Sequence, residues 1–194
     1  ELMREALART EKKLGARFFS ENKGHFWGIN ETRPYMRARC ELVFLLMQLE
    51  RIDEAILECE GVLDLNPNDN QGMRDILLGL YLQQRDTKKA RKLMSRYKES
   101  MFAVWCYGQL LECLLSGNLS GAERALQRAK SVNPHVLDFL IGRHKLRDTG
   151  HGAYSMGSEE EAVHCLKMLG PAFLANPKAL EWIAERVLGW PKRR

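Results

Sequence analysis

The residues that could carry out acid–base or metal chemistry are dispersed along this chain of 194 residues. It has five histidines, at positions 25, 135, 144, 151 and 164. A metal site or a general base needs several such groups at one point, and only His144 and His151 are close in sequence. The chain also lacks a Gly-x-Ser-x-Gly, P-loop or His-Glu-x-x-His motif. The sequence therefore predicts no catalytic residue, no metal site and no cofactor, and we expect the protein not to be an enzyme.

The five cysteines also favour a structural role. They are Cys40, Cys59, Cys106, Cys113 and Cys165. Their number is odd and no two form a Cys-x-x-Cys pair, which argues against a zinc module and against a disulfide framework. Each stands among apolar residues at helical spacing, where a free cysteine behaves as a small hydrophobic residue. We expect all of them in the core.

The stretch from Trp27 to Arg39 is the main candidate for partner recognition. It contains one carboxylate, Glu31, and three guanidinium groups, Arg33, Arg37 and Arg39. Arg33 and Arg37 stand four residues apart and would share one face of a helix. Guanidinium groups suit carboxylate or phosphate partners, so one hypothesis is that this cluster binds an acidic peptide. The alternative is that the arginines pair with acidic groups of their own fold, as half-buried arginine usually does.

Two aromatic residues are the second candidates. Trp105 and Tyr107 begin a predicted helix, and aromatic anchors often dominate the binding energy of an interface. The alternative is packing between neighbouring helices, since Trp and Tyr are usually largely buried.

The formal net charge of +5 raises the question of nucleic acid. The excess is concentrated in residues 88–92 and in the tail 192–194, and no basic stripe interleaved with aromatic residues accompanies it. Binding to RNA or to a ribonucleoprotein is therefore the secondary hypothesis. The longest apolar run, 42–47, is too short to span a membrane, and the charged first residues do not resemble a secretory signal. We expect a cytoplasmic or nuclear protein without a membrane association.

Small residues that recur at regular spacing indicate the architecture that positions these candidates. Ala55, Ala90 and Ala122 are 35 and then 32 residues apart, and the Asn-Pro pairs at 66–67 and 133–134 are 67 apart. Tetratricopeptide repeats have a period of about 34 residues and consist of two antiparallel helices. The small residue fits where the second helix of a pair crosses the first, and proline ends the helix at each corner. The sequence predicts an all-α fold, a right-handed α-α superhelix of antiparallel helix pairs.

The expected elements follow from this register. A helix over 1–14 and a short helical segment over 16–22 precede a loop, and Thr32 is a candidate cap for the next helix. Ser158 and Glu161 form a Ser-x-x-Glu capping box. The expected helix pairs are 33–49 with 52–65, 69–84 with 86–98, and 101–116 with 118–132. The expected later helices are 135–145, 158–169 and 177–188.

The repeat register also bears on which partner such a protein would bind. Tetratricopeptide domains that bind chaperone tails carry Lys and Asn at set positions of successive first helices. Here the corresponding positions hold Cys40, Phe44, Asp75 and Gly79, so that binding mode is absent. Arg37 and Arg74 remain candidates for a different anion.

Several segments resemble one known family. They are GHFWG at 24–28, ETRPYMRAR at 31–39, LNPNDNQGMR at 65–74, NPHV at 133–136, YSMGSEEEA at 154–162 and ALEW at 179–182. This set is similar to the tetratricopeptide-like proteins related to the suppressor of tumorigenicity seven family, over roughly residues 14 to 187. The resemblance implies a helical-repeat fold, an interaction role, and neither catalytic residues nor a cofactor.

These observations predict one domain over 1–194. Its expected parts are an N-terminal helix and loop (1–31), three helix-pair repeats (32–134), divergent C-terminal helices (135–188) and a tail (189–194). The expected function is that of a non-catalytic scaffold that binds a peptide or a helix, acidic peptides included, in the concave groove lined by the first helix of each pair. The candidate partner-binding residues are Trp27, Glu31, Arg33, Arg37, Arg74, Trp105 and Tyr107.

Overall fold

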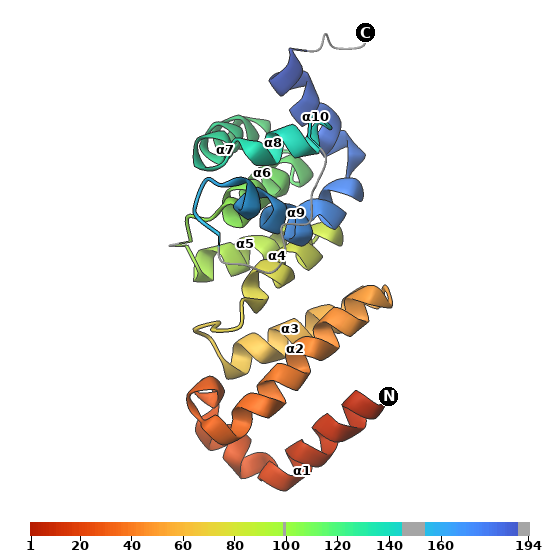
Figure 1. Ribbon diagram of the computed structural model, residues 1–194, viewed down its shortest axis with the longest axis vertical. Coiled ribbons are helices and arrows are strands. Elements are labelled where there is room, and N and C mark those ends of the chain that lie inside the picture. Colours follow the sequence, from red (N-terminus) through yellow and green to blue (C-terminus); the bar gives the residue numbers. More distant parts are fainter. Residues whose placement is uncertain (99, 145–153, 190–194) are drawn as a thin grey trace. The chain divides into compact units, whose positions relative to one another are not determined.

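The computed structural model describes residues 1–98, 100–144 and 154–189. Helices are the only regular secondary structure in these ranges, which confirms the predicted all-α class (Figure 1). The chain divides into two compact units, Glu1–Leu77 and Leu78–Arg194, and the division falls inside helix α4, Met73–Gln83.

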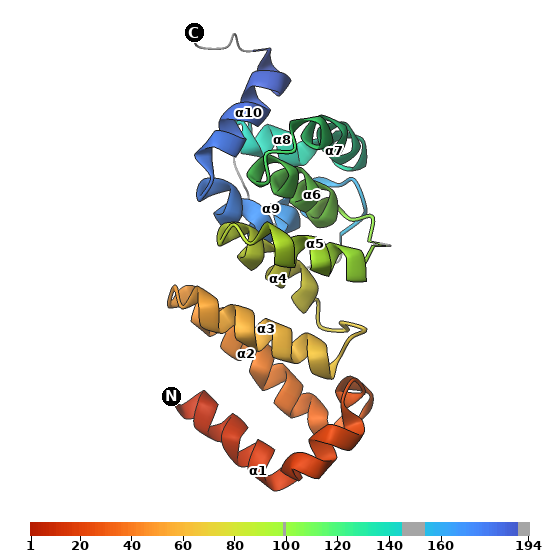
Figure 2. The ribbon, with the colours of Figure 1, turned by 180° about the vertical axis from the view of Figure 1, so that it is seen from behind.

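The first unit begins with helix α1, Leu2–Asn22, which changes direction at Gly15 (Figure 2). Gly15 has φ +79° and ψ 153°, non-helical values that glycine adopts easily, so the break expected between two helical segments is confirmed. Two short 3-10 turns, η1 (Phe26–Gly28) and η2 (Asn30–Thr32), follow in the segment predicted as a loop. They lead into α2, Arg33–Gln48, and α3, Ile52–Leu65, which match the predicted bounds closely.

An aromatic cluster joins α1 to the start of α2. Phe26 is fully buried, and its ring centroid lies 4.8 Å from that of Phe19 and 5.9 Å from that of Phe18. Tyr35 meets Phe19 edge to face at 5.7 Å. Its hydroxyl donates to Glu11 Oε1 at 2.7 Å. These contacts explain how the turn-rich loop is held against two helices without a metal or a disulfide.

The helix pair α2–α3 packs around the first recurring alanine. Ala55, Cys59 and Val62 occupy one face of α3 and are fully buried, and Leu42 and Leu46 of α2 are 3% and 1% exposed. The residues that the register predicted to lie inside this helix pair are therefore buried, as expected.

The second unit contains the rest of α4 and six further described helices. They are α5 (Thr87–Arg96), α6 (Ala103–Leu115), α7 (Leu119–Val132), α8 (His135–Leu140), α9 (Glu159–Leu174) and α10 (Pro177–Leu188). Helix α4 begins at Met73 rather than at the expected 69, and in this unit two bounds differ from expectation by more than two residues. The described helix α8 ends at Leu140 rather than at 145, and α9 continues past Pro171 to Leu174. The burial of Ala172 and Phe173 explains why α9 continues, because their packing offsets the hydrogen bond that proline cannot make.

Helix α6 is the centre of the second unit. It packs against α5, α7, α9 and α10. Two glycines permit the closest approaches: a Cβ at Gly108 would lie 2.7 Å from Leu78 Cδ2, and a Cβ at Gly79 would lie 2.2 Å from the carbonyl oxygen of Met168 on α9. The recurring Ala90 and Ala122 are fully buried, as expected from their register.

A fully buried carboxylate connects the start of α6, the end of α7 and the start of α9. Glu161 of α9 accepts hydrogen bonds from the backbone N–H of Ala103 at 3.0 Å, from Asn133 Nδ2 at 2.9 Å and from the N–H of Gly157 at 2.6 Å. The predicted capping box is therefore half correct. Ser158 Oγ does accept from the N–H of Glu161, at 3.2 Å, but the Glu161 side chain binds the starts of other segments instead of the N–H of Ser158.

Candidate functional site

The arginine cluster between Trp27 and Arg39 separates into structural and free members. Arg33 Nε donates to the carbonyl oxygen of Trp27 at 2.9 Å, and its guanidinium lies 5.5 Å from the centre of the Trp27 ring. Arg39 Nη2 lies 2.6 Å from Glu58 Oε2 of α3. Pairing with an acidic group of the fold thus describes Arg39, whereas Arg33 is held by the backbone carbonyl and the ring of Trp27.

Glu31 and Arg37 differ from those two. Both are exposed, and neither has an ion pair or a side-chain hydrogen bond among the described residues. Thr32 occupies the cap position before α2 as expected, but its hydroxyl donates to the carbonyl oxygen of Ile29 at 2.9 Å and does not cap the helix. The loop is thereby fixed, while Arg37 is presented on the surface of α2.

Arg74 is held by two carboxylates at the start of α4. Its Nε lies 3.6 Å from Asp69 Oδ2 and 3.9 Å from Asp75 Oδ1. Asp69 also accepts from the N–H groups of Met73 at 2.7 Å and Arg74 at 3.1 Å, so it caps this helix. Burial raises the pKa of Asp69 to about 6, against the opposing effect of these hydrogen bonds and of the Arg74 charge. Arg74 therefore already has acidic partners within its own unit.

The two aromatic candidates lie in the core of the second unit. Tyr107 has no exposed surface, and its hydroxyl donates to the carbonyl oxygen of Asn133 at 2.7 Å. Trp105 is 5% exposed and meets Tyr97 edge to face, with ring centroids 6.1 Å apart. The packing alternative, rather than an open anchor, describes both side chains.

Equivalent positions of the repeat allow the helices to be compared. We call the positions fifteen and eleven residues before each recurring alanine the first-helix face. They are Cys40 and Phe44 on α2, Asp75 and Gly79 on α4, and Tyr107 and Leu111 on α6.

On α2 the first-helix face is buried at Cys40 and open at Phe44, and in the second unit it is covered. Phe44 is 40% exposed, whereas Leu111 is fully buried and Gly79 lies under the backbone of Met168. Helix α9 packs against α6, and burial is the main cause that raises the pKa of Tyr107, ahead of the nearby Cys165 of α9. In the second unit, the chain's own helix α9 therefore fills the face that was expected to receive a partner.

A continuous exposed stripe remains on α2. We define the α2 stripe as Arg37, Glu41, Phe44 and Gln48, which recur at helical spacing and are all exposed. Beside it, Leu45 is 38% exposed. An aromatic side chain flanked by an unpaired cation and an anion is a suitable anchor for a peptide or an amphipathic helix. Only Arg37 of this stripe was among the sequence candidates; the position of Phe44 in the repeat register was the available signal for the rest.

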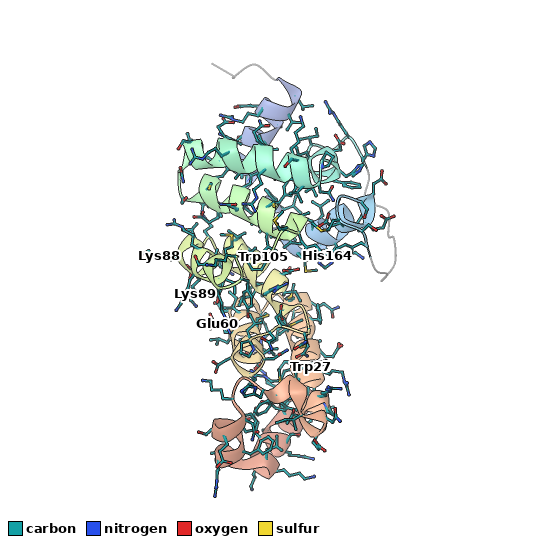
Figure 3. The ribbon with its side chains drawn as sticks, turned by 90° about the vertical axis from the view of Figure 1, so that its left-hand side faces the viewer. Trp27, Glu60, Lys88, Lys89, Trp105 and His164 are labelled. Atoms are coloured by element: carbon teal, nitrogen blue, oxygen red, sulfur yellow. The ribbon has the colours of Figure 1, made fainter. Side chains whose placement is uncertain are left out.

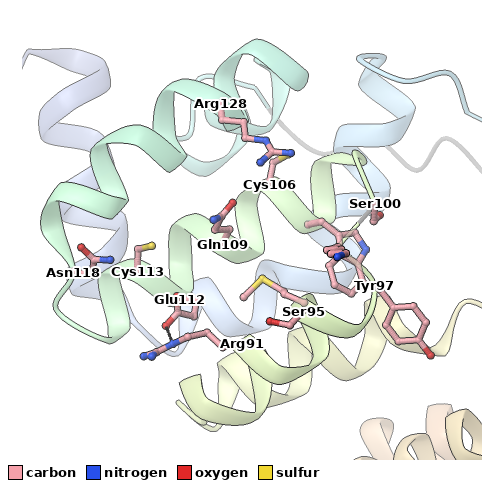
Figure 4. Close-up of a pocket in the computed structure, with 13 residues that line it drawn as sticks. Arg91, Ser95, Tyr97, Ser100, Cys106, Gln109, Glu112, Cys113, Asn118 and Arg128 are labelled. Atoms are coloured by element: carbon pink, nitrogen blue, oxygen red, sulfur yellow. Dashed lines mark hydrogen bonds and ion pairs between the residues drawn. The ribbon is translucent and has the colours of Figure 1, made fainter. Parts of the chain in front are cut away.

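The second unit contains a groove between α5 and α7. Helix α6 forms its floor, and its volume is about 420 Å³ (Figure 4). We call it the α5–α7 groove. Its charged lining residues are Arg91, Lys98, Glu112 and Arg128. Arg91 and Lys98 belong to the basic run 88–98 that motivated the RNA hypothesis. Glu112 and Arg128 were not singled out from the sequence, because a groove between two second helices depends on how the pairs pack and not on local periodicity.

The remaining reactive groups do not converge. The cysteines are all buried and none forms a disulfide, which confirms the core prediction, and burial raises the pKa of Cys40 to about 12. His164 stacks on Tyr154, with ring centroids 4.9 Å apart. His144 is exposed and follows the end of α8 by four residues. His151 lies outside the described residues. Within the described ranges there is no group of three or more residues with metal-ligating side chains.

Comparison of the chain with protein-family models, with curated proteins and with solved structures found no match. Among the described helices, none is long and apolar enough to cross a membrane.

Proposed function

We propose that this chain is a non-catalytic helical-repeat protein that binds a protein partner through the α2 stripe. The two pairs α2–α3 and α6–α7, each built around a buried alanine, support a tetratricopeptide-like architecture. That architecture is a right-handed superhelix of the kind implied by the resemblance to the suppressor of tumorigenicity seven family. The partner lies along α2 of the first unit.

The exposure of Phe44 carries this proposal. An aromatic side chain that is 40% exposed on a helix loses contact with water when a partner covers it, which is a favourable change of about 1–2 kcal/mol. Arg37 lies one helical turn before Glu41. It provides a guanidinium for a carboxylate of the partner. The stripe is therefore suited to a peptide or helix that combines an apolar anchor with an acidic residue.

Site-specific crosslinking tests the proposal. A photo-activatable amino acid at Gln48, on the stripe, should form adducts with a discrete protein in cell extract. The matched control is the same substitution at Leu57 of α3, which is 64% exposed but outside the stripe. Adding Phe44→Ala should abolish the adduct from position 48. Adducts that form equally at both positions, or that survive Phe44→Ala, would contradict the proposal.

A second candidate function is RNA binding, and the basic surface of α5 favours it. Lys88, Lys89, Arg91 and Lys92 are all exposed, and Lys88 and Lys89 project from this helix (Figure 3). Contacts of this kind are electrostatic and weaken steeply with salt. A labelled single-stranded RNA should bind at low salt and lose affinity on Lys88→Gln with Lys92→Gln. No measurable binding at low salt excludes this function.

A further inference from the structure

The α5–α7 groove has the dimensions of a binding site. Its volume of about 420 Å³ lies within the range of small-ligand pockets, roughly 300–1,000 Å³. Figure 4 shows α6 between α5 and α7, with Arg91 and Glu112 joined at one end and Arg128 reaching down from α7 toward Cys106. The groove is formed by the second unit alone, and it uses side chains of α6 other than those that α9 covers.

The charges of the groove do not cancel. Among the described residues, Glu112 is the single acidic residue of the lining; its side chain is 7% exposed and its Oε1 lies 2.6 Å from Arg91 Nε, so one cation neutralises it. Lys98 and Arg128 remain on opposite walls, both exposed and without an ion pair among the described residues. The potential of the groove is therefore positive, and an anionic ligand is favoured.

Neutral hydrogen-bonding groups lie between these charges. Gln109 is exposed on the floor, with no hydrogen bond among the described residues. Ser100 Oγ, at the end near Trp105, is buried and has no hydrogen-bond partner. An extended peptide presents backbone N–H and C=O groups that an amide and a hydroxyl can satisfy. Met94 and the edge of Trp105 add an apolar portion beside them.

We propose that the α5–α7 groove binds an acidic, extended peptide segment of a partner protein. Two carboxylates of the segment pair with Arg128 and Lys98, Gln109 binds its backbone, and an apolar side chain contacts Met94 and Trp105. Charge complementarity identifies this occupant. RNA is disfavoured because Trp105 is 5% exposed and cannot offer the ring face on which a base would stack. This site is separate from the α2 stripe, so its failure leaves the proposed function of the stripe untouched.

Fluorescence anisotropy tests the proposal on the full chain. The probe is a fluorescein-labelled peptide of alternating aspartate and leucine, and its control peptide has asparagine in place of each aspartate. Arg128→Gln and Lys98→Gln should each weaken binding of the acidic peptide about tenfold, the loss expected for one charge-assisted contact. The matched control Lys130→Gln on α7, whose exposed side chain does not line the groove, should change it less than about twofold.

A second variant removes space instead of charge. Gln109→Trp places a large ring on the floor and should abolish binding, while circular dichroism shows that the helices persist. The proposal is overturned if the acidic peptide does not bind at low salt. It is also overturned if the asparagine peptide binds equally well, or if groove and control variants lose affinity alike. Tighter binding of a short single-stranded RNA, weakened by the same groove variants, would assign the groove to nucleic acid and likewise overturn it.

Discussion

The same position of the repeat is surface in one unit and core in the other. On α2 of the first unit, Phe44 is 40% exposed, whereas on α6 of the second unit the equivalent Leu111 is fully buried. Both stand eleven residues before a buried alanine, so the repeat itself does not cause the difference. The cause is α9, a helix outside the repeat that packs along α6. The comparison teaches that a repeat register predicts which residues share a face, but not whether that face is available.

This difference has a physical origin in α9 itself. Its buried residues face α6 and the close approach at Gly79, and Glu161 satisfies three N–H groups that would otherwise be unpaired. Buried polar groups that lose a partner cost more than a typical hydrogen bond contributes, so this carboxylate anchors α9 firmly. Helix α9 is therefore part of the core and not a displaceable ligand.

Truncation of the two equivalent residues should give the largest contrast. Leu111→Ala leaves a cavity in the second unit and should lower the free energy of unfolding by about 2–5 kcal/mol. Phe44→Ala removes a partly exposed ring and should cost less than about 1 kcal/mol. Urea denaturation followed by circular dichroism measures both. Equal losses in the two variants would mean that α2 is covered as well, which would contradict the comparison.

The anchoring of α9 by Glu161 should be visible in a conservative variant. Glu161→Gln replaces one acceptor oxygen by an NH2 group that must face a buried donor, and we expect a loss of about 2–3 kcal/mol in the free energy of unfolding. Glu181→Gln, at an exposed carboxylate of α10, should leave the denaturation midpoint unchanged. If Glu161→Gln unfolds at the same midpoint as the unmodified protein, the carboxylate is not the anchor.

The close approach of α4 and α9 predicts opposite effects at two glycines. Gly79→Ala puts a Cβ against the carbonyl oxygen of Met168 and should cost about 1–3 kcal/mol of stability. Gly170→Ala, on α9 itself, has open space around its Cβ and should stabilise the helix by about 0.5–1 kcal/mol. Thermal denaturation of the two variants compares them directly. A gain in stability for both would show that α9 does not approach α4 closely.

The first unit should instead show a pH effect. Asp69 has a folded-state pKa of about 6, above its ordinary value of 3.8, so the folded state binds a proton more tightly. Its contribution therefore favours folding below about pH 4 and is lost as pH rises through 6, by on the order of 3 kcal/mol, since one pKa unit corresponds to about 1.4 kcal/mol. The slope of stability against pH between 4 and 6 should be more positive in Asp69→Asn than in the unmodified protein. Parallel slopes would contradict the raised pKa.

Much of the local structure could be predicted from the sequence because its determinants are local. The recurring alanines and the Asn-Pro corners gave the bounds of α2 and α3 within a residue or so, and the break at Gly15 followed from the glycine. The bounds of α10 were also predicted, but the contact that its Asn176 corner makes was not. Asn176 Oδ1 accepts from Arg85 Nη1 at 3.0 Å, which ties the start of α10 to the end of α4.

The candidate site was harder to predict, because its accessibility depends on contacts distant in sequence. Tyr107 does lie on the first-helix face, but α9, more than 50 residues later, occupies that side. Arg33 and Arg39 have the charge expected of a binding cluster, but a backbone carbonyl and Glu58 bind them. Residue type and spacing identified the surface, and only tertiary packing showed which part of it stays open.

Thiol labelling of two single variants tests the central claim most directly. The native cysteines are buried, so they give a low background in the folded protein. The account predicts that Phe44→Cys reacts with a maleimide reagent about as fast as an unfolded control, whereas Leu111→Cys stays protected until the protein unfolds. Similar labelling rates at the two positions in the folded protein would contradict the claim that α9 closes one first-helix face and leaves the α2 stripe open.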